Sequence, residues 1–209
     1  GTGRCSAALG ERYPKAQVVA VDLAHGMVRR TRSRFGRLNR LFRGHGFVCG
    51  DTEHLPFEDA AFDLIFSNLT LQWCDSERTF EEFRRLLRPG GLLMFTTFGP
   101  DTLKELRAAW ARVDRHVHVN EFPDMHHLGD GMINAGLADP VVDMEFLNLT
   151  YDDVPALMRD LKSIGAQTIR GGRRSGLTGK ARLKALAQAY EQFRGDSDGR
   201  LPSTWEIVY

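Results

Sequence analysis

The sequence predicts an α/β fold with a mostly parallel, doubly wound sheet. Short apolar stretches of strand length alternate along the chain with amphipathic stretches of helix length, which is the order that βαβ units require. The length of 209 residues fits a single domain. The hydrophobic fraction of 42% and the charged fraction of 26% are ordinary for a globular protein.

The first half of the chain supplies the strands of the expected parallel sheet. These strands are predicted at residues 18–22, 47–49, 62–67 and 92–97. Helices are predicted between them, at residues 5–13, 27–41 and 76–87. Pro89-Gly90-Gly91 predicts a turn into the last of these strands. A doubly wound sheet normally opens with a strand that leads into its glycine loop, so we expect that first strand to be missing before Gly1.

The second half predicts a different mixture of elements. Helices are predicted at residues 102–113, 154–164 and 180–193, a loop followed by a helix at 119–136, and strands at 141–149 and 204–209. Asp101 is placed to cap the first of these helices. Residues 1–209 are expected to form one domain, in which the stretch at about 150–200 is a substrate-facing insertion or lid.

The overall charge argues against a nucleic-acid partner. Lys and Arg total 28 against 27 Asp and Glu, a formal net charge of +1, whereas a nucleic-acid-binding domain is clearly basic. Cys5, Cys49 and Cys74 form no C-x-x-C pair, so neither a disulfide framework nor a zinc site is expected. No apolar run reaches the roughly 18 residues of a membrane span, and no signal peptide is recognisable. We therefore expect a reducing, cytoplasmic setting.

A glycine turn and an acidic strand end suggest a nucleotide site. Gly1-Thr2-Gly3 precedes a predicted helix, and glycines there let backbone N–H groups approach a ligand that a Cβ would exclude. A simple tight turn explains the same residues. Asp22 ends the next strand 19 positions after Gly3, close to the roughly 20-residue spacing of an acid that binds ribose hydroxyls. A helix N-cap is the alternative role for Asp22.

Four motifs at successive strand ends resemble those of the class I methyltransferases, which use S-adenosylmethionine. They are Asp22-Leu23 with Met27, the run from Gly50 to Phe57, Phe62-Asp63-Leu64-Ile65, and the run from Leu87 to Leu92. An ordinary NAD enzyme would share the glycines and Asp22 but not the second and fourth motifs. The resemblance implies a Rossmann-like fold with an antiparallel final strand, and S-adenosylmethionine as the cofactor.

The same resemblance implies roles for individual residues. It places Gly1, Thr2 and Gly3 in the cofactor loop, Asp22 on the ribose, Leu23 and Met27 against the adenine, Asp51 and Thr52 at the adenine edge, and Asn68 and Leu69 along the methionine end. Gln72 and Trp73 follow the Asn68 strand end and are expected to wall the site near the transferred methyl group. A plain core position explains Trp73 nearly as well.

The chain resembles one family within this class, the malonyl-acyl-carrier-protein O-methyltransferases of biotin synthesis. The similar stretches of the second half are residues 98–107, 118–120, 161–166 and 172–206. They imply methyl transfer to the free carboxylate of malonyl on the carrier protein. Methyltransferases of small carboxylic acids or quinones remain alternatives, and so does a protein that only binds the cofactor. Methyltransferase-fold assembly factors that hydroxylate an arginine of a partner are also similar, at residues 98–107 and 201–205.

The implied chemistry needs a cation rather than a base. A malonyl carboxylate is ionised at neutral pH, as carboxyl groups with a pKa of about 4 are, so no catalytic residue is predicted and rate is expected from positioning and desolvation. An arginine fork suits selection of a carboxylate. The candidates are Arg159, Arg170, Arg173 and Arg174. A solvated loop position is the simpler explanation for any single one, and together with Lys180 and Lys184 they also suit docking of an acidic carrier protein.

Two further clusters predict no site. Seven arginines lie between residues 29 and 43, and a solvated helix face explains them best, with partner docking as a minor hypothesis. The other cluster comprises His116, His118, His126, His127, Asp124 and Asp130. His126 and Asp130 are one helical turn apart, but no convincing third ligand joins them. Because methyl transfer needs no metal, no metal site is expected.

Overall fold

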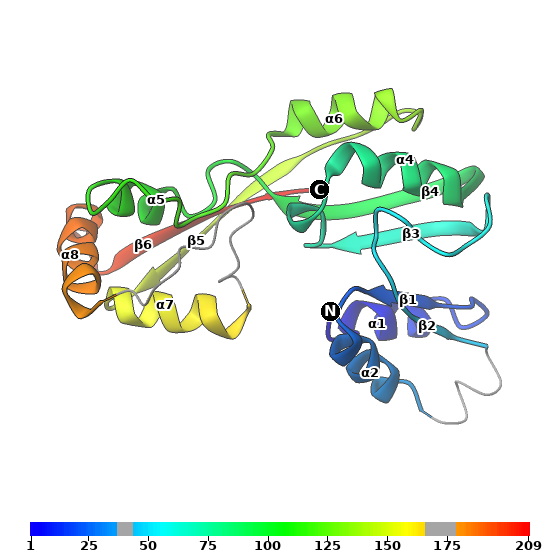
Figure 1. Cartoon of the computed structure of the whole chain (residues 1–209), viewed down its shortest axis with the longest axis horizontal. Coiled ribbons are helices and arrows are strands. Elements are labelled where there is room, and N and C mark those ends of the chain that lie inside the picture. The colour runs from blue at the N-terminus through cyan, green and yellow to red at the C-terminus, as the bar shows by residue number, and fades with distance from the viewer. Residues whose placement is uncertain (37–43, 166–178) are drawn as a thin grey trace. The chain divides into compact units, whose positions relative to one another are not determined.

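The structure, a computed structural model, describes residues 1–36, 44–165 and 179–209 (Figure 1). The chain forms two compact units. Unit 1 comprises residues 1–95 and 131–138, and unit 2 comprises residues 96–130 and 139–209. Within the described ranges, no helix has both the length and the apolar character needed to cross a membrane.

Unit 1 opens with a helix and a parallel pair of strands. Helix α1 (Arg4–Arg12) leads to strand β1 (Val19–Asp22), helix α2 (His25–Arg34) and strand β2 (Gly46–Cys49). The two strands pair in parallel from Val19 and Gly46 to Asp22 and Cys49, so they end at the same edge. Helix α2 packs against both strands and buries Val28 and Thr31.

Helix α2 is shorter than the sequence predicts. It ends at Arg34 rather than near residue 41, and Phe35 has extended backbone angles, φ −86° and ψ 120°. The Phe35 ring is 7% exposed and lies against the rings of His45 and Phe47, with centroids 4.9 and 5.2 Å away. Burial of this ring takes the chain out of the helix. Residues 37–43, with three of the seven arginines, lie outside the described residues.

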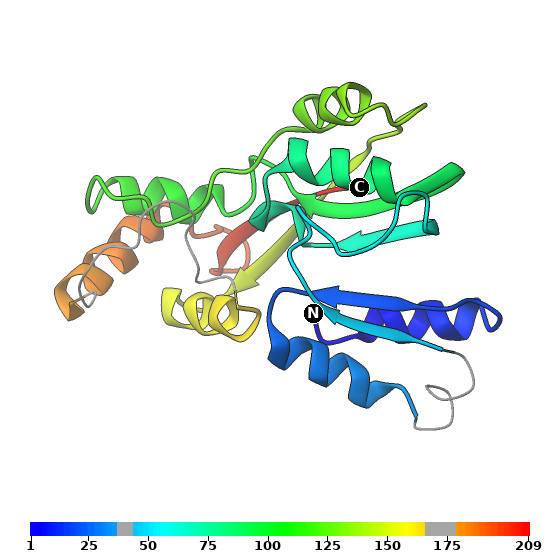
Figure 2. The same cartoon turned by 45° about the vertical axis from the view of Figure 1, so that its right-hand side comes forward.

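The rest of unit 1 is a strand–helix–strand arrangement. Strand β3 (Phe62–Asn68) is followed by the 3₁₀ helix η1 (Leu71–Trp73), helix α4 (Ser76–Leu86) and strand β4 (Leu87–Phe98), and β3 and β4 are neighbours in one sheet. Helix α4 lies along β4 in both views (Figure 1 and Figure 2), and the rings of Phe80 and Phe95 meet with centroids 5.7 Å apart. Asp75 caps α4 by accepting a hydrogen bond from the Arg78 N–H. The helix has the amphipathic character that was predicted for residues 76–87.

Strand β4 begins earlier than predicted. It follows α4 directly at Leu87, and Pro89-Gly90-Gly91 lies within the strand rather than in a separate turn. Gly90 has a φ of +78°. A Cβ on Gly91 would lie 3.0 Å from the Arg88 carbonyl oxygen and 3.3 Å from that of Asp63 in β3. The two glycines therefore let a bent strand begin close beside β3.

The strands of the described residues form two sheets. One holds β1 and β2, and the other has the order β3-β4-β6-β5. Strands β5 (Met144–Tyr151) and β6 (Leu201–Val208) belong to unit 2 and pair antiparallel along their whole length. The final strand β6 is also antiparallel to the end of β4 at Thr97 and Phe98. It starts at Leu201 rather than residue 204, and the Leu201 side chain is 1% exposed.

Helices flank the β5–β6 pair in unit 2. They are α5 (Lys104–Ala111), α7 (Val154–Ser163) and α8 (Lys180–Tyr190), with the 3₁₀ helix η2 (Glu191–Phe193) after α8. Helix α6 (Met125–Asn134) has residues in both units. The prediction of Asp101 as the cap of α5 is wrong. The cap is Leu103, with a φ of +58°. Its N–H donates to the Thr204 carbonyl oxygen at 2.7 Å, so a backbone contact with β6 sets where this helix begins. The Asp101 carboxylate instead pairs with Lys104 at 3.0 Å.

Candidate cofactor site

The carboxyl ends of β1 and β2 bring two of the predicted positions together. Asp22 is opposite Cys49 in the strand register. The Gly50 N–H donates to the Asp22 carbonyl oxygen at 3.2 Å, and the Cys49 thiol donates to the Leu23 carbonyl oxygen at 3.3 Å. Residues 22–23 and 49–51 are therefore neighbours at the sheet edge where open α/β sheets bind ligands.

The glycine loop lies beside Asp22. The Gly1 backbone nitrogen lies next to the Asp22 carboxylate. Helix α2 holds the loop from the other side, because the Thr31 hydroxyl donates to the Gly1 carbonyl oxygen at 3.1 Å and the Arg34 Nε donates to that of Thr2 at 2.5 Å. Asp22 also accepts the Ala24 N–H at 2.8 Å. The carboxylate thus stabilises the turn into α2. This resembles the helix N-cap role that is the alternative for Asp22, although the N-cap residue of α2 is Ala24.

Gly3 has a packing role that the sequence does not reveal. Its φ is +77°, and a Cβ there would lie 2.7 Å from the Thr31 Cα. Helix α1 begins at the next residue. The start of α1 and helix α2 can therefore approach this closely only because residue 3 has no side chain. The predicted role of the glycines in exposing backbone N–H groups to a ligand stays a prediction.

Leu23 and Met27 are apolar side chains that the protein leaves exposed. Leu23 is 73% exposed and Met27 is 38% exposed. Small-molecule sites combine apolar surface with a few placed polar groups, and here the two apolar residues belong to the turn and helix that directly follow Asp22. A purine ring could cover Leu23 and Met27 while its ribose hydroxyls donate to Asp22. These residues fit the adenosine part of S-adenosylmethionine.

The loop after β2 carries Asp51 and Thr52 and is fixed by carboxylates. The Asp51 side chain accepts the Glu53 N–H at 3.0 Å, and its carbonyl oxygen accepts the His54 N–H at 3.1 Å. This is an Asx turn, in which the side chain stabilises its own loop. The Glu53 carboxylate accepts the Asp75 N–H at 2.8 Å. The start of α4 is thereby tied to the loop that presents Asp51.

Glu82 and Arg85 of α4 hold the rest of this loop. Glu82 accepts the Leu55 N–H at 2.7 Å, while Arg85 donates to the carbonyl oxygens of Leu55 and Phe57 at 3.1 and 2.8 Å. The two side chains also pair with each other at 2.7 Å. The hydrogen bond from Arg85 lowers the pKa of Glu82, and this outweighs the opposite effect of burial. Sequence reasoning missed both residues; the available signal was an acid and a base three residues apart on a predicted helix.

The end of β3 carries the residues predicted for the methionine end of the cofactor. Asn68 ends the strand, and Leu69 has a φ of +50°, which costs a residue with a side chain roughly 1–2 kcal/mol. The Gln72 amide donates to the Leu69 carbonyl oxygen at 2.8 Å, and Gln72 is 6% exposed. Trp73 is 38% exposed, unlike a plain core residue. Strained backbone of this kind is common at ligand sites.

The predicted cofactor residues all belong to unit 1, but they follow strands of two different sheets. The register of β1 and β2, with the glycine loop, groups Gly1, Asp22, Leu23 and Asp51. Asn68 and Leu69 lie at and after the end of a strand of the other sheet. The pairing of β1 with β2 therefore does not place them beside Asp22 and Asp51. Their part in binding the cofactor stays a prediction.

The predicted carboxylate-binding arginines belong to the second half of the chain. Arg159 is exposed on α7 in unit 2. Arg170, Arg173 and Arg174 lie outside the described residues. The prediction that one or more of them binds the substrate carboxylate stands untested.

The histidine cluster has a packing role at His118. Its Nε2 lies 2.8 Å from the Asp114 carboxylate, and its ring stacks on Trp110 with centroids 3.7 Å apart. Burial raises the pKa of Asp114, but the hydrogen bonds from the His116 backbone and the His118 ring outweigh it, so the pKa is lowered. In the part of the chain that the structure describes, no three His, Cys, Asp or Glu side chains are grouped closely enough to hold a metal ion.

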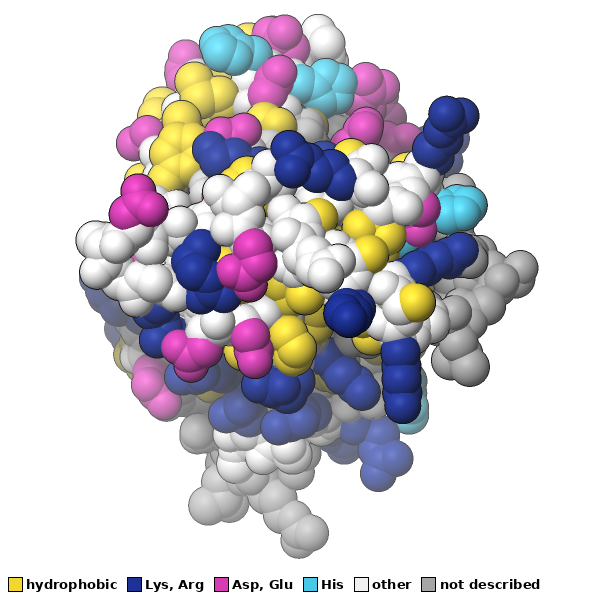
Figure 3. Space-filling view, turned by 90° about the vertical axis from the view of Figure 1, so that its left-hand side faces the viewer, with side chains coloured by type: hydrophobic (Ala, Val, Ile, Leu, Met, Phe, Trp, Pro, Cys, Tyr) yellow, Lys and Arg dark blue, Asp and Glu magenta, His cyan; other side chains and the backbone are white. Residues whose placement is uncertain are grey.

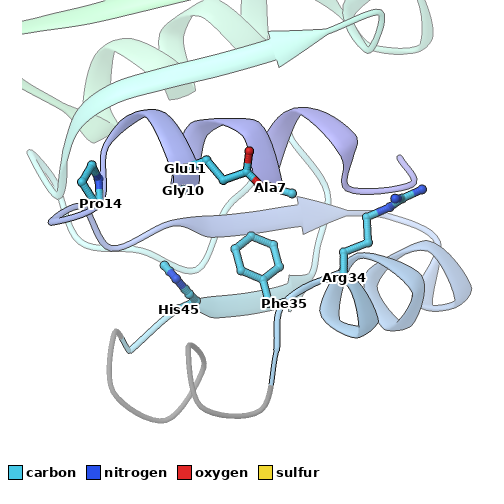
Figure 4. A pocket seen from close by; sticks show the side chains of 7 residues that line it. All are labelled: Ala7, Gly10, Glu11, Pro14, Arg34, Phe35 and His45. Carbon is cyan, nitrogen blue, oxygen red and sulfur yellow. The ribbon is translucent and has the colours of Figure 1, made fainter.

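A separate hollow lies between helix α1 and the end of helix α2 (Figure 4). There the Val18 N–H donates to His45 Nδ1 at 3.1 Å. The residues that line the hollow are Ala7, Gly10, Glu11, Pro14, Arg34, Phe35 and His45. None of the predicted cofactor residues is among them, so the hollow is distinct from the site at the carboxyl ends of the strands.

Known proteins resemble the chain over its whole length. A family model described as a methyltransferase domain matches residues 1–95. A protein of Methylovorus sp. (strain MP688) named malonyl-(acyl-carrier protein) O-methyltransferase is 49% identical over 213 residues, which cover 100% of this chain and 71% of that protein. One of the same name from Nitrosospira multiformis is 48% identical over 223 residues, with 100% and 72% covered. The chain belongs to the malonyl-(acyl-carrier protein) O-methyltransferase family.

Solved structures agree with this O-methyltransferase family assignment at the level of the fold. A putative methyltransferase from Bacillus halodurans C-125 has a TM-score of 0.62 at 16% identity, covering 99% of this chain and 87% of its own. The Rossmann-like α/β fold with an antiparallel final strand is confirmed. The family resemblance seen in the motifs of the sequence is confirmed as well.

Proposed function

We propose that this chain is an enzyme that transfers a methyl group from S-adenosylmethionine to the free carboxylate of malonyl-acyl-carrier protein. The product is the malonyl methyl ester used in biotin synthesis. The observation that carries the proposal is the 49% identity, over the whole chain, to a protein named for this reaction. A Saccharophagus degradans protein named as a bifunctional protein of biotin biosynthesis, 44% identical over 216 residues, supports the pathway. We place the enzyme in the cytoplasm, where exposed thiols such as Cys5 and Cys49 stay reduced.

The β1–β2 edge suits the cofactor half of the reaction. Asp22 accepts hydrogen bonds from the ribose hydroxyls, and Leu23 and Met27 cover the adenine ring. Asp51 and Thr52 lie at the adenine edge, and the loop from Gly1 to Gly3 contributes backbone groups. Asn68 and Leu69 line the methionine end. S-adenosylmethionine, when bound, supplies a methyl group on a positively charged sulfur.

The acceptor half requires no proton transfer from the protein. The substrate carboxylate is already ionised at neutral pH, as carboxyl groups with a pKa of about 4 are. The side chains therefore have to select the carboxylate, orient it and exclude water, and positioning of this kind can account for a large rate enhancement. Gln72 and Trp73 wall the site. The arginines of the stretch at about 150–200, Arg159, Arg170, Arg173 and Arg174, select the carboxylate.

A comparison of acceptors tests the proposed reaction. The purified protein is given labelled S-adenosylmethionine with malonyl-carrier protein, free malonate, or a quinone precursor, and labelled ester is measured. We expect ester to form on malonyl-carrier protein, with little transfer to the other two. Transfer only to the free acid or the quinone, or hydroxylation of a partner arginine instead, would overturn the proposal.

Asp22→Asn tests the cofactor half. The amide keeps an oxygen that can accept the Ala24 N–H, so the fold is expected to persist, but it removes the charge. A hydrogen bond to a charged group is worth about 1.5–3 kcal/mol, so cofactor affinity measured by calorimetry is expected to fall at least about tenfold. Asp63→Asn is the matched control, because this exposed carboxylate pairs only with Arg88 among the described residues, at 2.8 Å. Equal weakening by both changes would contradict the assignment of Asp22.

A further inference from the structure

Helix α8 begins with an unusual concentration of positive charge. Lys180, Arg182 and Lys184 lie within its first five residues, and the helix contains no carboxylate. Its cap residue Gly179 offers no side chain to the free N–H groups of the first turn. The helix dipole already makes this end positive, and like charges four residues apart repel each other on a helix face. These cations therefore lower the stability of the helix that carries them.

Lys180 and Lys184 face away from the core of unit 2, and Arg182 is half-buried. The side chains that α8 buries are Leu186 and Tyr190, both 0% exposed, and the Tyr190 hydroxyl donates to the Pro202 carbonyl oxygen at 2.9 Å. Lys180 and Lys184 are exposed, and between them Leu183 is 42% exposed. We refer to Lys180, Arg182, Leu183 and Lys184 as the α8 basic surface.

No carboxylate of the described residues forms an ion pair with the α8 basic surface. The next acid along the chain, Glu191, pairs with Arg194 at 2.5 Å. Helix α7 packs against α8 and adds the exposed cations Arg159 and Lys162. On the side of the molecule where α5 and α8 lie, Figure 3 shows many Lys and Arg side chains, with Asp and Glu side chains among them. The surface thus combines positive charge without internal partners and one exposed apolar side chain.

We propose that the α8 basic surface docks the acyl-carrier protein, through a carboxylate-bearing surface of that protein with an apolar contact at Leu183. The inference rests on the proposed function, which supplies the carrier as a partner. Carboxylates placed beside Lys180 and Lys184 remove both the repulsion between the lysines and their unfavourable interaction with the helix dipole. Exposed charges at such an interface act mainly on the association rate and on its dependence on salt.

The test compares two charge reversals on two acceptors. Lys180→Glu with Lys184→Glu changes the docking surface, and Arg29→Glu with Arg30→Glu makes the same change in charge on exposed positions of α2. Each protein is assayed on malonyl-carrier protein and on malonyl-pantetheine, which lacks the carrier. At low salt, kcat/KM of the α8 variant is expected to fall about tenfold or more on the carrier-bound substrate. On malonyl-pantetheine it should change less than about twofold, and the α2 variant should keep both activities.

The outcomes separate docking from methyl transfer. If the unaltered protein methylates neither acceptor, the proposed function fails. If it methylates both and the α8 variant retains full activity on malonyl-carrier protein, or if only the α2 variant loses it, the docking inference is overturned and the proposed function stands. Raising the salt concentration should narrow the difference between the α8 variant and the unaltered protein, because screening weakens exposed charges at separations beyond about 8 Å.

A variant with neutral side chains and an exchange of charge between the two proteins distinguish loss of docking from loss of folding. Lys180→Gln with Lys184→Gln keeps a similar helix propensity and is expected to lose about threefold in kcat/KM on malonyl-carrier protein. Its unfolding temperature should stay level or rise, because the repulsion between the lysines is removed. A carrier protein whose docking carboxylates are changed to lysine should restore activity to the Lys180→Glu, Lys184→Glu variant and lose it with the unaltered enzyme. Failure of every such carrier to restore activity would contradict docking at α8.

Discussion

Changing Gly3 to alanine places a methyl group where the structure has no room for one. An ideal Cβ at this position lies 2.7 Å from both the Cα and the Cγ2 of Thr31, whereas carbon atoms in contact lie about 3.5–4.0 Å apart. One of these atoms belongs to the backbone of α2, so rotation of a side chain cannot relieve the contact. The φ of +77° adds a second difficulty, because only glycine adopts it readily.

The two effects add to a large part of the stability of a domain. The left-handed conformation costs a residue with a side chain about 1–2 kcal/mol, and overpacking a close contact costs roughly 1–3 kcal/mol. The free energy of unfolding is therefore expected to fall by about 2–5 kcal/mol, compared with the roughly 5–15 kcal/mol of a typical protein. At about 2–4 °C per kcal/mol for a chain of this size, Tm should fall by roughly 4–20 °C.

Thermal unfolding followed by circular dichroism measures this change. Gly26→Ala is the matched control, because Gly26 lies in α2 with open space around its Cβ position. Alanine is a better helix former than glycine by up to about 1 kcal/mol, so Tm of this control should stay level or rise. If Gly3→Ala unfolds at the temperature of the unaltered protein, the packing argument is refuted. Loss of stability with unchanged cofactor affinity would confine the role of Gly3 to packing.

Two further predictions concern the loop after β2 and the substrate. Glu82→Gln is expected to lower the free energy of unfolding at pH 7 by about 1–2 kcal/mol. In the folded protein the pKa of Glu82 lies below its ordinary value of 4.5. The stabilisation by the Glu82 carboxylate is therefore complete above pH 4.5 and is lost as the pH falls through the folded pKa. In urea titrations the difference between variant and unaltered protein should therefore shrink below about pH 4.5, and a difference that stays constant to pH 3 would contradict the ion-pair account. Arg173→Ala with Arg174→Ala is expected to raise KM for malonyl-carrier protein much more than the Kd of the cofactor, whereas equal losses would indicate a folding defect.

The elements that were predicted accurately are those whose sequence signals lie within the element or directly beside it. Strand β1 ends at Asp22 as expected, because a β-branched run closed by an acid needs no distant partner to be recognised. Helix α4 has a cap at Asp75 and a regular apolar face, and it was predicted to within one residue of its observed end. The motifs that identified the family lie at these same strand ends.

The errors arise where distant residues decide the local structure. Helix α2 ends early because Phe35 packs against rings that follow it by 10 and 12 positions. The start of α5 is set by the hydrogen bond from Leu103 to Thr204, about a hundred positions away. Neither contact leaves a trace in the local pattern of apolar and polar residues, so capping and periodicity rules predicted the wrong boundaries.

The position of Asp51 shows why a motif alone does not describe a binding site. The motif places this carboxylate at a strand end, but the strand fixes only the first residues of the loop that presents it. The remainder is held by Glu53 on the Asp75 N–H and by Glu82 and Arg85 on the backbone of residues 55–57. A loop that is ordered before binding avoids the loss of conformational entropy on binding. Affinity at Asp51 therefore depends on α4 side chains that lie outside the predicted cofactor contacts, and Glu82→Gln should weaken cofactor binding as well as stability.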